Sequence, residues 1–108
     1  MRLGRDNEQA LVDTVVERIA EAVKPDQIIL FGSRARGDAT EDSDLDLLLV
    51  YDGPLTKRQV KMAVRRLFPR PSFSMDLFVL TPAEFSRQQK VVSTLGHAAI
   101  RQGIVCHG

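Results

Sequence analysis

The sequence has few of the residues that crosslink or anchor small proteins. It contains one cysteine, Cys106, and no tryptophan. A single cysteine excludes an intrachain disulfide and a zinc site built from cysteines, and it fits a reducing compartment, so we expect a cytoplasmic protein. The longest apolar run, at residues 47–51, is too short to cross a membrane. The polar residues 1–9 lack the apolar centre of a signal peptide, so we expect neither a leader nor a membrane anchor.

Length and composition are those of an ordinary globular protein. The chain has 108 residues, of which 44% are hydrophobic and 27% are charged. This length supports one hydrophobic core and not two, so we expect residues 1–108 to form a single domain. The composition excludes the disordered, collagen-like and low-complexity classes.

The charged residues are segregated along the chain, although the net charge is only +1. Residues 38–46 hold five acids and no base, and residues 53–75 hold six bases and no acid. Within the basic segment, Lys57, Lys61 and Arg65 share one face of a predicted helix. This face could contact a nucleotide, an RNA acceptor or an acidic partner, and a solvated surface explains it equally well.

The hydrophobic pattern predicts alternating helices and strands. Helical spacing of apolar residues indicates a helix at 6–23, and Thr56 and Thr81 begin capping-box patterns for two further helices. We expect an α+β (α/β) fold in which a small mixed β-sheet of three to four strands is flanked by helices. The expected strands are 27–31, 44–51, 72–80 and a short edge strand at 104–106, and the expected helices are 6–23, one from Thr56 to the prolines at 69 and 71, one from Pro82 and one at 93–102.

Carboxylates interrupt two of these strands where apolar residues are otherwise continuous. Because side chains alternate between the faces of a strand, Asp44 and Asp46 point the same way. Asp76 shares a face with Phe78 on the third strand. If these two strands are neighbours, three carboxylates converge, and a hard divalent cation such as Mg²⁺ would offset their repulsion. Taken singly, each aspartate is better explained as an ordinary strand or turn acid. Taken together, in strands this apolar, the three favour a metal site.

A Gly-Ser turn precedes the aspartates at a fixed distance. Gly32 and Ser33 follow the first strand, where backbone N–H groups can meet a phosphate. Arg34 and Arg36 stand next to the turn and could neutralise a triphosphate. Alone, Gly-Ser is an ordinary turn, but here ten residues separate it from Asp44-x-Asp46. We estimate that this pattern arises by chance in about one chain of this length in a thousand.

The segment GSRARGDATEDSDLDLLLV resembles the signature of the DNA polymerase beta-like nucleotidyltransferase superfamily, and the short chain resembles its minimal nucleotidyltransferases. The resemblance implies the nucleotidyltransferase fold and transfer of a nucleoside monophosphate, with AMP expected, from an NTP to an acceptor hydroxyl, releasing pyrophosphate. It implies that Gly32 and Ser33 hold the triphosphate. It further implies that Asp44 and Asp46 ligand two Mg²⁺ ions, or Mn²⁺ in their place. Asp76 matches the third carboxylate, as metal ligand and base.

The resemblance also suggests a partner. Minimal nucleotidyltransferases resemble antitoxins that pair with a helical HEPN-type ribonuclease toxin. The acceptor could therefore be a protein, an RNA or a second copy of the chain. Three interpretations stay open: an ATP-binding, magnesium-dependent transferase, a non-catalytic antitoxin-like subunit that covers its partner, and a nucleotide sensor that does not turn over.

Overall fold

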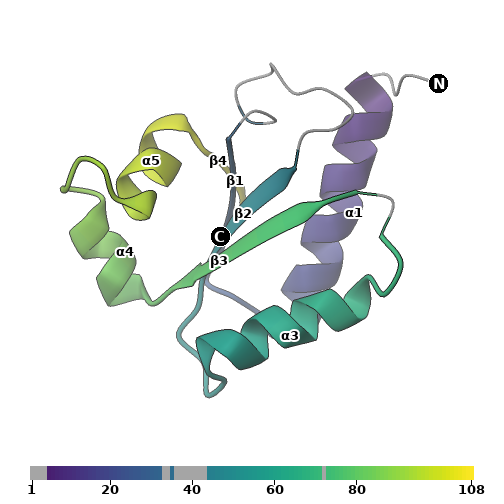
Figure 1. The fold of residues 1–108 in the computed structure, drawn as a ribbon, viewed down its shortest axis with the longest axis horizontal. Coiled ribbons are helices and arrows are strands. Elements are labelled where there is room, and N and C mark those ends of the chain that lie inside the picture. Colours follow the sequence, from purple (N-terminus) through teal and green to yellow (C-terminus); the bar gives the residue numbers. More distant parts are fainter. Residues whose placement is uncertain (1–4, 33–34, 36–43, 72) are drawn as a thin grey trace.

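The fold is built around a four-stranded mixed sheet in the order β3-β2-β1-β4. The computed structural model describes residues 5–32, 35, 44–71 and 73–108. β1 runs antiparallel to both β2 and β4, whereas β2 and β3 are parallel and joined through α3 (Figure 1). The elements are α1 (Arg5–Val23), β1 (Gln27–Phe31), β2 (Leu45–Val50), α3 (Lys57–Leu67), β3 (Met75–Leu80), α4 (Pro82–Gln88), α5 (Leu95–Gln102) and β4 (Ile104–His107).

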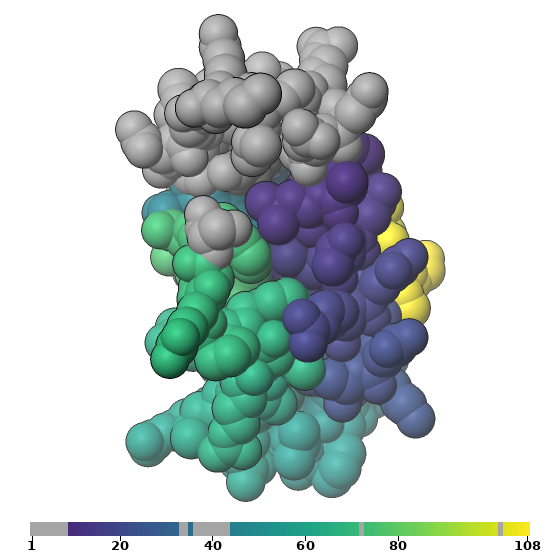
Figure 2. Space-filling model, turned by 90° about the vertical axis from the view of Figure 1, so that its right-hand side faces the viewer, coloured from purple at the N-terminus to yellow at the C-terminus, as the bar shows by residue number. Residues whose placement is uncertain are grey.

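Helices cover both faces of the sheet, and each face has its own buried cluster. α1 and α3 pack side by side on one face (Figures 1 and 2). Their buried valines and Ile19 form one cluster with Leu45, Leu47 and Leu49 of β2. On the other face, Leu48 and Val50 pack with residues of α4 and α5. β2 is therefore apolar on both sides because both sides are covered. The predicted fold class is confirmed.

The sequence predicted most elements within one or two residues, with two differences at element starts. The third strand begins at Met75 and not at residue 72, because its parallel partner β2 begins at Leu45, which pairs with Met75. Phe73 instead packs edge-on against Phe68, with ring centroids 5.8 Å apart. The last helix begins at Leu95 and not at residue 93, because the Thr94 side chain accepts the His97 N–H and caps it.

Both predicted capping boxes are present. At α3, the Thr56 side chain accepts the Gln59 N–H, and the Gln59 side chain accepts the Thr56 N–H. At α4, Thr81 and Glu84 exchange the same two bonds. Among the helices of the described residues, none is both long and apolar enough to cross a membrane.

An exposed ion pair ties the starts of α3 and α4 together. Lys57 Nζ lies 2.7 Å from Glu84 Oε1. The hydrogen bond from Lys57, and then that from the Thr81 backbone, lower the pKa of Glu84 from 4.5 to about 2. A lowered folded-state pKa stabilises the protein above the ordinary pKa, and this contribution disappears as pH falls through the folded-state value.

We therefore predict that Glu84→Gln destabilises the protein near neutral pH by no more than about 1 kcal/mol, because the pair is partly exposed. The difference from wild type should vanish between about pH 4.5 and pH 2, the window set by the two pKa values. Urea unfolding of both proteins at several pH values measures this difference in the free energy of unfolding. Glu21→Gln, at an exposed position of α1, is the matched control and should show no such pH dependence. A constant difference across this pH range would contradict the prediction.

Candidate functional site

The strand register places two of the predicted carboxylates side by side. Asp46 of β2 pairs with Asp76 of parallel β3 on one side and with Phe31 of antiparallel β1 on the other. Paired residues on adjacent strands lie about 4.8 Å apart and point to the same face. This is the face that α4 and α5 cover farther along the strands. The two aspartate-bearing strands are therefore neighbours, which is the condition for their carboxylates to converge.

Asp44 stands just before β2, at the end of the paired strands. The Leu45 N–H donates to the Ser74 carbonyl at 2.8 Å, which fixes the start of β2 beside the approach to β3. Asp44 and Asp76 are exposed, and Asp46 is half-buried. Asp44 lies two residues before Asp46, which corresponds to about 7 Å along a strand. We call Asp44, Asp46 and Asp76 the carboxylate row.

The carboxylate row offers the oxygen donors that Mg²⁺ prefers. As their side chains lie, however, the described residues contain no group of three His, Cys, Asp or Glu side chains arranged to hold a metal ion. The sheet thus brings Asp46 and Asp76 together, and Asp44 is not gathered with them into one three-ligand cluster. The donor chemistry fits a divalent cation, and a metal at these residues remains a prediction.

Gly32 brings the backbone directly against the Asp46 carboxylate. It follows β1 with a φ of +76°, in the left-handed region that glycine adopts readily. A Cβ added at Gly32 would collide with Oδ2 of Asp46 and lie 3.1 Å from its Cγ. The space beside the Asp46 carboxylate therefore exists because residue 32 has no side chain. Glycine at position 32 therefore allows both the left-handed backbone turn and the close approach of the backbone to the Asp46 carboxylate.

The rest of the predicted phosphate-binding segment lies outside the described residues. This applies to Ser33, Arg34 and Arg36. Their assignment to the triphosphate remains a prediction from the sequence.

Comparison with known proteins decides the family. The Nucleotidyltransferase domain family matches residues 12–102, which is most of the chain. The chain belongs to the nucleotidyltransferase domain family. The matched span includes Gly32, Ser33 and the whole carboxylate row, so the resemblance noted from these residues is confirmed at the level of the family.

Two curated relatives come from Methanocaldococcus jannaschii and carry similar names. "Putative protein adenylyltransferase MJ0141" is 42% identical over 57 residues, which cover 52% of this chain and 56% of the relative. "Putative protein adenylyltransferase MJ0604" is 69% identical over 26 residues, covering 24% of this chain and 26% of the relative. Each match therefore spans less than two thirds of the relative's own length.

Solved structures share the fold. A structure described as a "putative nucleotidyltransferase from Sulfolobus solfataricus" has a TM-score of 0.59 at 25% identity, covering 89% of this chain and 76% of that one. A toxin–antitoxin complex with AMP-PNP has a TM-score of 0.61 at 20% identity, covering 86% and 70%. A variant of the toxin–antitoxin MntA-HpeT has a TM-score of 0.58 at 17% identity, covering 86% and 70%. The last two likenesses concern the fold alone.

Two phenylalanines form an apolar wall beside the carboxylates of this nucleotidyltransferase domain. The rings of Phe31 and Phe78 lie 5.6 Å apart, tilted by 51°, on the same face as Asp46. Sequence reasoning placed Phe78 on the face of Asp76 but did not connect it with Phe31. The missing signal was the strand order, because alternation within one strand does not say which residue lies opposite. Apolar rings beside a carboxylate lower the local dielectric, which strengthens the charge interactions that the carboxylate makes.

The residues of the predicted basic face of α3 do not share one contact. Lys57 is held by Glu84 of α4. Arg65 instead lines a hollow of about 370 Å³ near the start of β3, together with Phe68, Phe73 and Met75. Neither contact identifies a nucleotide, an RNA or a partner, so the role of Lys57, Lys61 and Arg65 remains a prediction.

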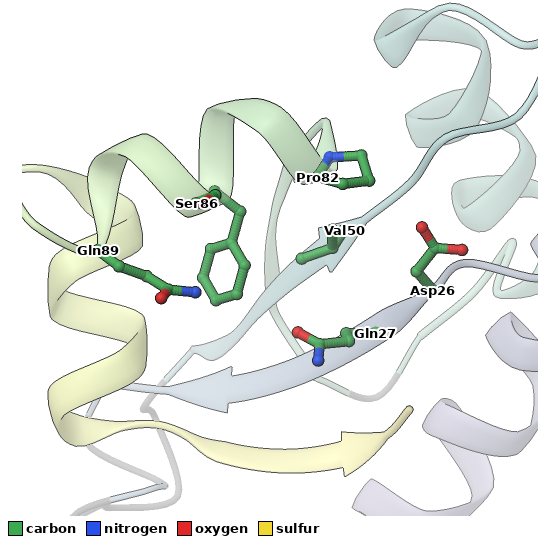
Figure 3. Close-up of a pocket in the computed structure, with 7 residues that line it drawn as sticks. Asp26, Gln27, Val50, Pro82, Ser86 and Gln89 are labelled. Atoms are coloured by element: carbon green, nitrogen blue, oxygen red, sulfur yellow. The ribbon is translucent and has the colours of Figure 1, made fainter.

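A second hollow lies at the far end of the sheet (Figure 3). It measures about 340 Å³ and lies between α4 and the strand positions where Gln27 pairs with Val50. The Phe31–Asp46 pair is four residues along the same strand, a separation of about 13 Å. This hollow is therefore not part of the carboxylate site. Its lining residues are Asp26, Gln27, Val50, Pro82, Phe85, Ser86 and Gln89.

Proposed function

We propose that this domain transfers a nucleoside monophosphate from an NTP to an acceptor hydroxyl and releases pyrophosphate. The observation that carries the proposal is the register that pairs Asp46 with Asp76 directly beside Gly32. Membership of the nucleotidyltransferase domain family supports the reaction class. The names of the two curated relatives favour ATP as the donor and a protein as the acceptor.

In this proposal each part of the site has one task. Gly32 and Ser33 bind the triphosphate through backbone and hydroxyl donors, and Arg34 and Arg36 neutralise part of its charge. Asp44, Asp46 and Asp76 hold two Mg²⁺ ions, with Mn²⁺ as a substitute. When bound, these ions supply positive charge that offsets the charge developing on the phosphate oxygens.

The proposed reaction breaks one bond and forms another. The acceptor oxygen bonds to the α-phosphorus, and the bond between that phosphorus and the bridging α–β oxygen breaks. Pyrophosphate takes the bonding electrons and leaves. The acceptor hydroxyl gives its proton to Asp76, the exposed carboxylate of the edge strand β3. Positioning of the two reactants supplies the rest of the rate enhancement.

A protein partner is the expected source of the acceptor. The toxin–antitoxin structures that share this fold support a partner chain, and the one crystallised with AMP-PNP supports nucleotide binding. A HEPN-type toxin is the partner that the sequence resemblance implies. An RNA acceptor and a second copy of the chain are the alternatives.

The test is a labelling reaction with ATP carrying a radioactive α-phosphate, Mg²⁺ and host extract. We expect label on a protein with the wild-type chain and none with Asp44→Asn. Asp52→Asn, which changes an exposed carboxylate in the turn after β2, is the control and should label like wild type. Label on RNA would change the acceptor class and keep the reaction. Equal labelling by wild type and Asp44→Asn would contradict the proposed site.

A non-catalytic, partner-covering subunit is the second candidate. The observation that favours it is that the described side chains contain no three-carboxylate group arranged for a metal. In that case Asp44→Asn would neutralise a co-expressed partner toxin as well as wild type does, and no label would be transferred.

A further inference from the structure

The edge strand β4 is open to a further strand. In the described part of the chain, β4 pairs with β1 and no strand lies on its other side. Ile104 and Val105 are about half exposed, at 50% and 51%. β4 has no lysine, proline or charged inward-pointing residue to protect this edge; its only protections are its length of four residues and the irregular pairing with β1 between Ile28 and Ile29. An apolar, β-branched edge of this kind is suited to strand addition.

An acidic helix borders this edge. α1 packs beside β4. In Figure 2, the yellow C-terminal end of the chain is visible at the right-hand edge, next to the purple and blue atoms of α1. Between them lies a groove of about 300 Å³. Asp13 and Glu17, both exposed and one helical turn apart, line it from the helix side. Its other described lining residues are Gln9, Val16, Ile104, Val105 and Cys106, so among the residues that the structure describes the groove carries two acids and no base.

Two neighbouring residues indicate that the Asp13 side chain lies toward the groove. Gln9 Nε2 donates to Asp13 Oδ1 at 2.9 Å. Burial raises the pKa of Cys106 on β4, and the Asp13 charge raises it further. The carboxylate therefore acts across the groove on the strand.

The charges argue against a second copy of the chain as the occupant. Two β4 strands that pair antiparallel are related by a two-fold axis perpendicular to the sheet, so α1 of one copy would face α1 of the other. Asp13 and Glu17 would then approach the same residues of the second copy, and like charges repel. The negative charge of the groove favours an occupant that carries positive charge.

We propose that the β4 edge is the docking site for an extended segment of a protein partner, with Lys or Arg side chains facing Asp13 and Glu17 and apolar side chains on the opposite face. The segment adds to β4 as a fifth strand. Because side chains alternate between the two faces of a strand, its basic side chains lie on the α1 face of the sheet and its apolar side chains lie on the other face. The aliphatic stems of its basic residues cover Ile104, and its apolar residues cover Val105. This surface is separate from the carboxylate row, because β1 lies between β4 and β2.

The test uses a short synthetic peptide in which Lys and Val alternate, titrated into the ¹⁵N-labelled protein. We expect amide shifts concentrated at β4 and at the Asp13–Glu17 turn of α1, with slowed hydrogen exchange along β4. Glu17→Lys should weaken binding about tenfold. Asp52→Lys makes the same charge change at an exposed turn away from the groove and should change binding less than about twofold.

Three results would overturn the proposal. One is the absence of shifts at β4. Another is equal weakening by Glu17→Lys and Asp52→Lys, which would mean that the peptide responds only to net charge. The third is a dimer in light scattering that Val105→Lys dissociates, which would make a second copy the occupant. Val105 and Glu17 are exposed, so both variants should fold, and circular dichroism checks this. None of these results bears on nucleotide transfer.

Discussion

Asp46→Asn is expected to lower the rate of label transfer from ATP by at least about 100-fold while the protein remains folded. Asp46 is the central carboxylate of the row, paired with Asp76 on β3 and adjacent to Gly32. Asparagine keeps the size of the side chain and removes its charge. The lost charge should weaken the proposed cation binding, and the similar shape should preserve the packing beside Phe31.

Label transfer and urea unfolding together separate the two effects. Urea unfolding should show that the variant still folds cooperatively, because asparagine keeps the size of the side chain. Asp52→Asn should leave both the transfer rate and the stability unchanged. If Asp46→Asn kept full transferase activity, divalent-cation catalysis at the carboxylate row would be wrong.

Gly32→Ala is expected to abolish transfer and to destabilise the protein by about 1–3 kcal/mol. Alanine at a φ of +76° is strained, and its Cβ would collide with Oδ2 of Asp46. The collision has to be relieved by moving the carboxylate or the turn. Either movement disturbs the place where the backbone, the triphosphate and the metal are proposed to meet.

Gly103→Ala is the matched control for this prediction. A Cβ at Gly103 would collide with the Ala99 carbonyl oxygen and crowd Ile29, at the junction of α5 and β4. We expect a similar loss of stability by thermal unfolding, and transfer close to wild type at a temperature where the variant is folded. Equal loss of transfer in the two variants would mean that Gly32 acts only through stability.

The faces of the strand carboxylates could be predicted because the alternation of side chains along a strand is a local property. The apolar run around Asp46 likewise indicated that β2 is internal. That β2 and β3 are neighbours was only a condition in the sequence, and the structure supplies it. The capping boxes at Thr56 and Thr81 could also be predicted from the sequence, since each depends on a few consecutive residues.

Properties that depend on distant partners could not be predicted in this way. The start of β3 is set by Leu45 on another strand, and the Phe31–Phe78 wall is set by the order of three strands. The groove between α1 and β4 joins residues from the two ends of the chain. The collision that makes Gly32 necessary involves Asp46, fourteen positions later in the sequence. Periodicity contains no information about these contacts.

The most direct test of the carboxylate site is a titration of the ¹⁵N-labelled protein with Mn²⁺ in the presence of a non-hydrolysable ATP analogue. Mn²⁺ is paramagnetic and broadens nearby amide signals whether or not an acceptor is present. We predict the strongest broadening at Gly32, Asp46 and Asp76, weaker broadening at Gln27 and Val50 about 13 Å farther along the strands, and loss of this pattern in Asp46→Asn. Broadening centred on Asp13 and Glu17, or broadening that survives in Asp46→Asn, would contradict the proposal that the carboxylate row holds the metal and the nucleotide.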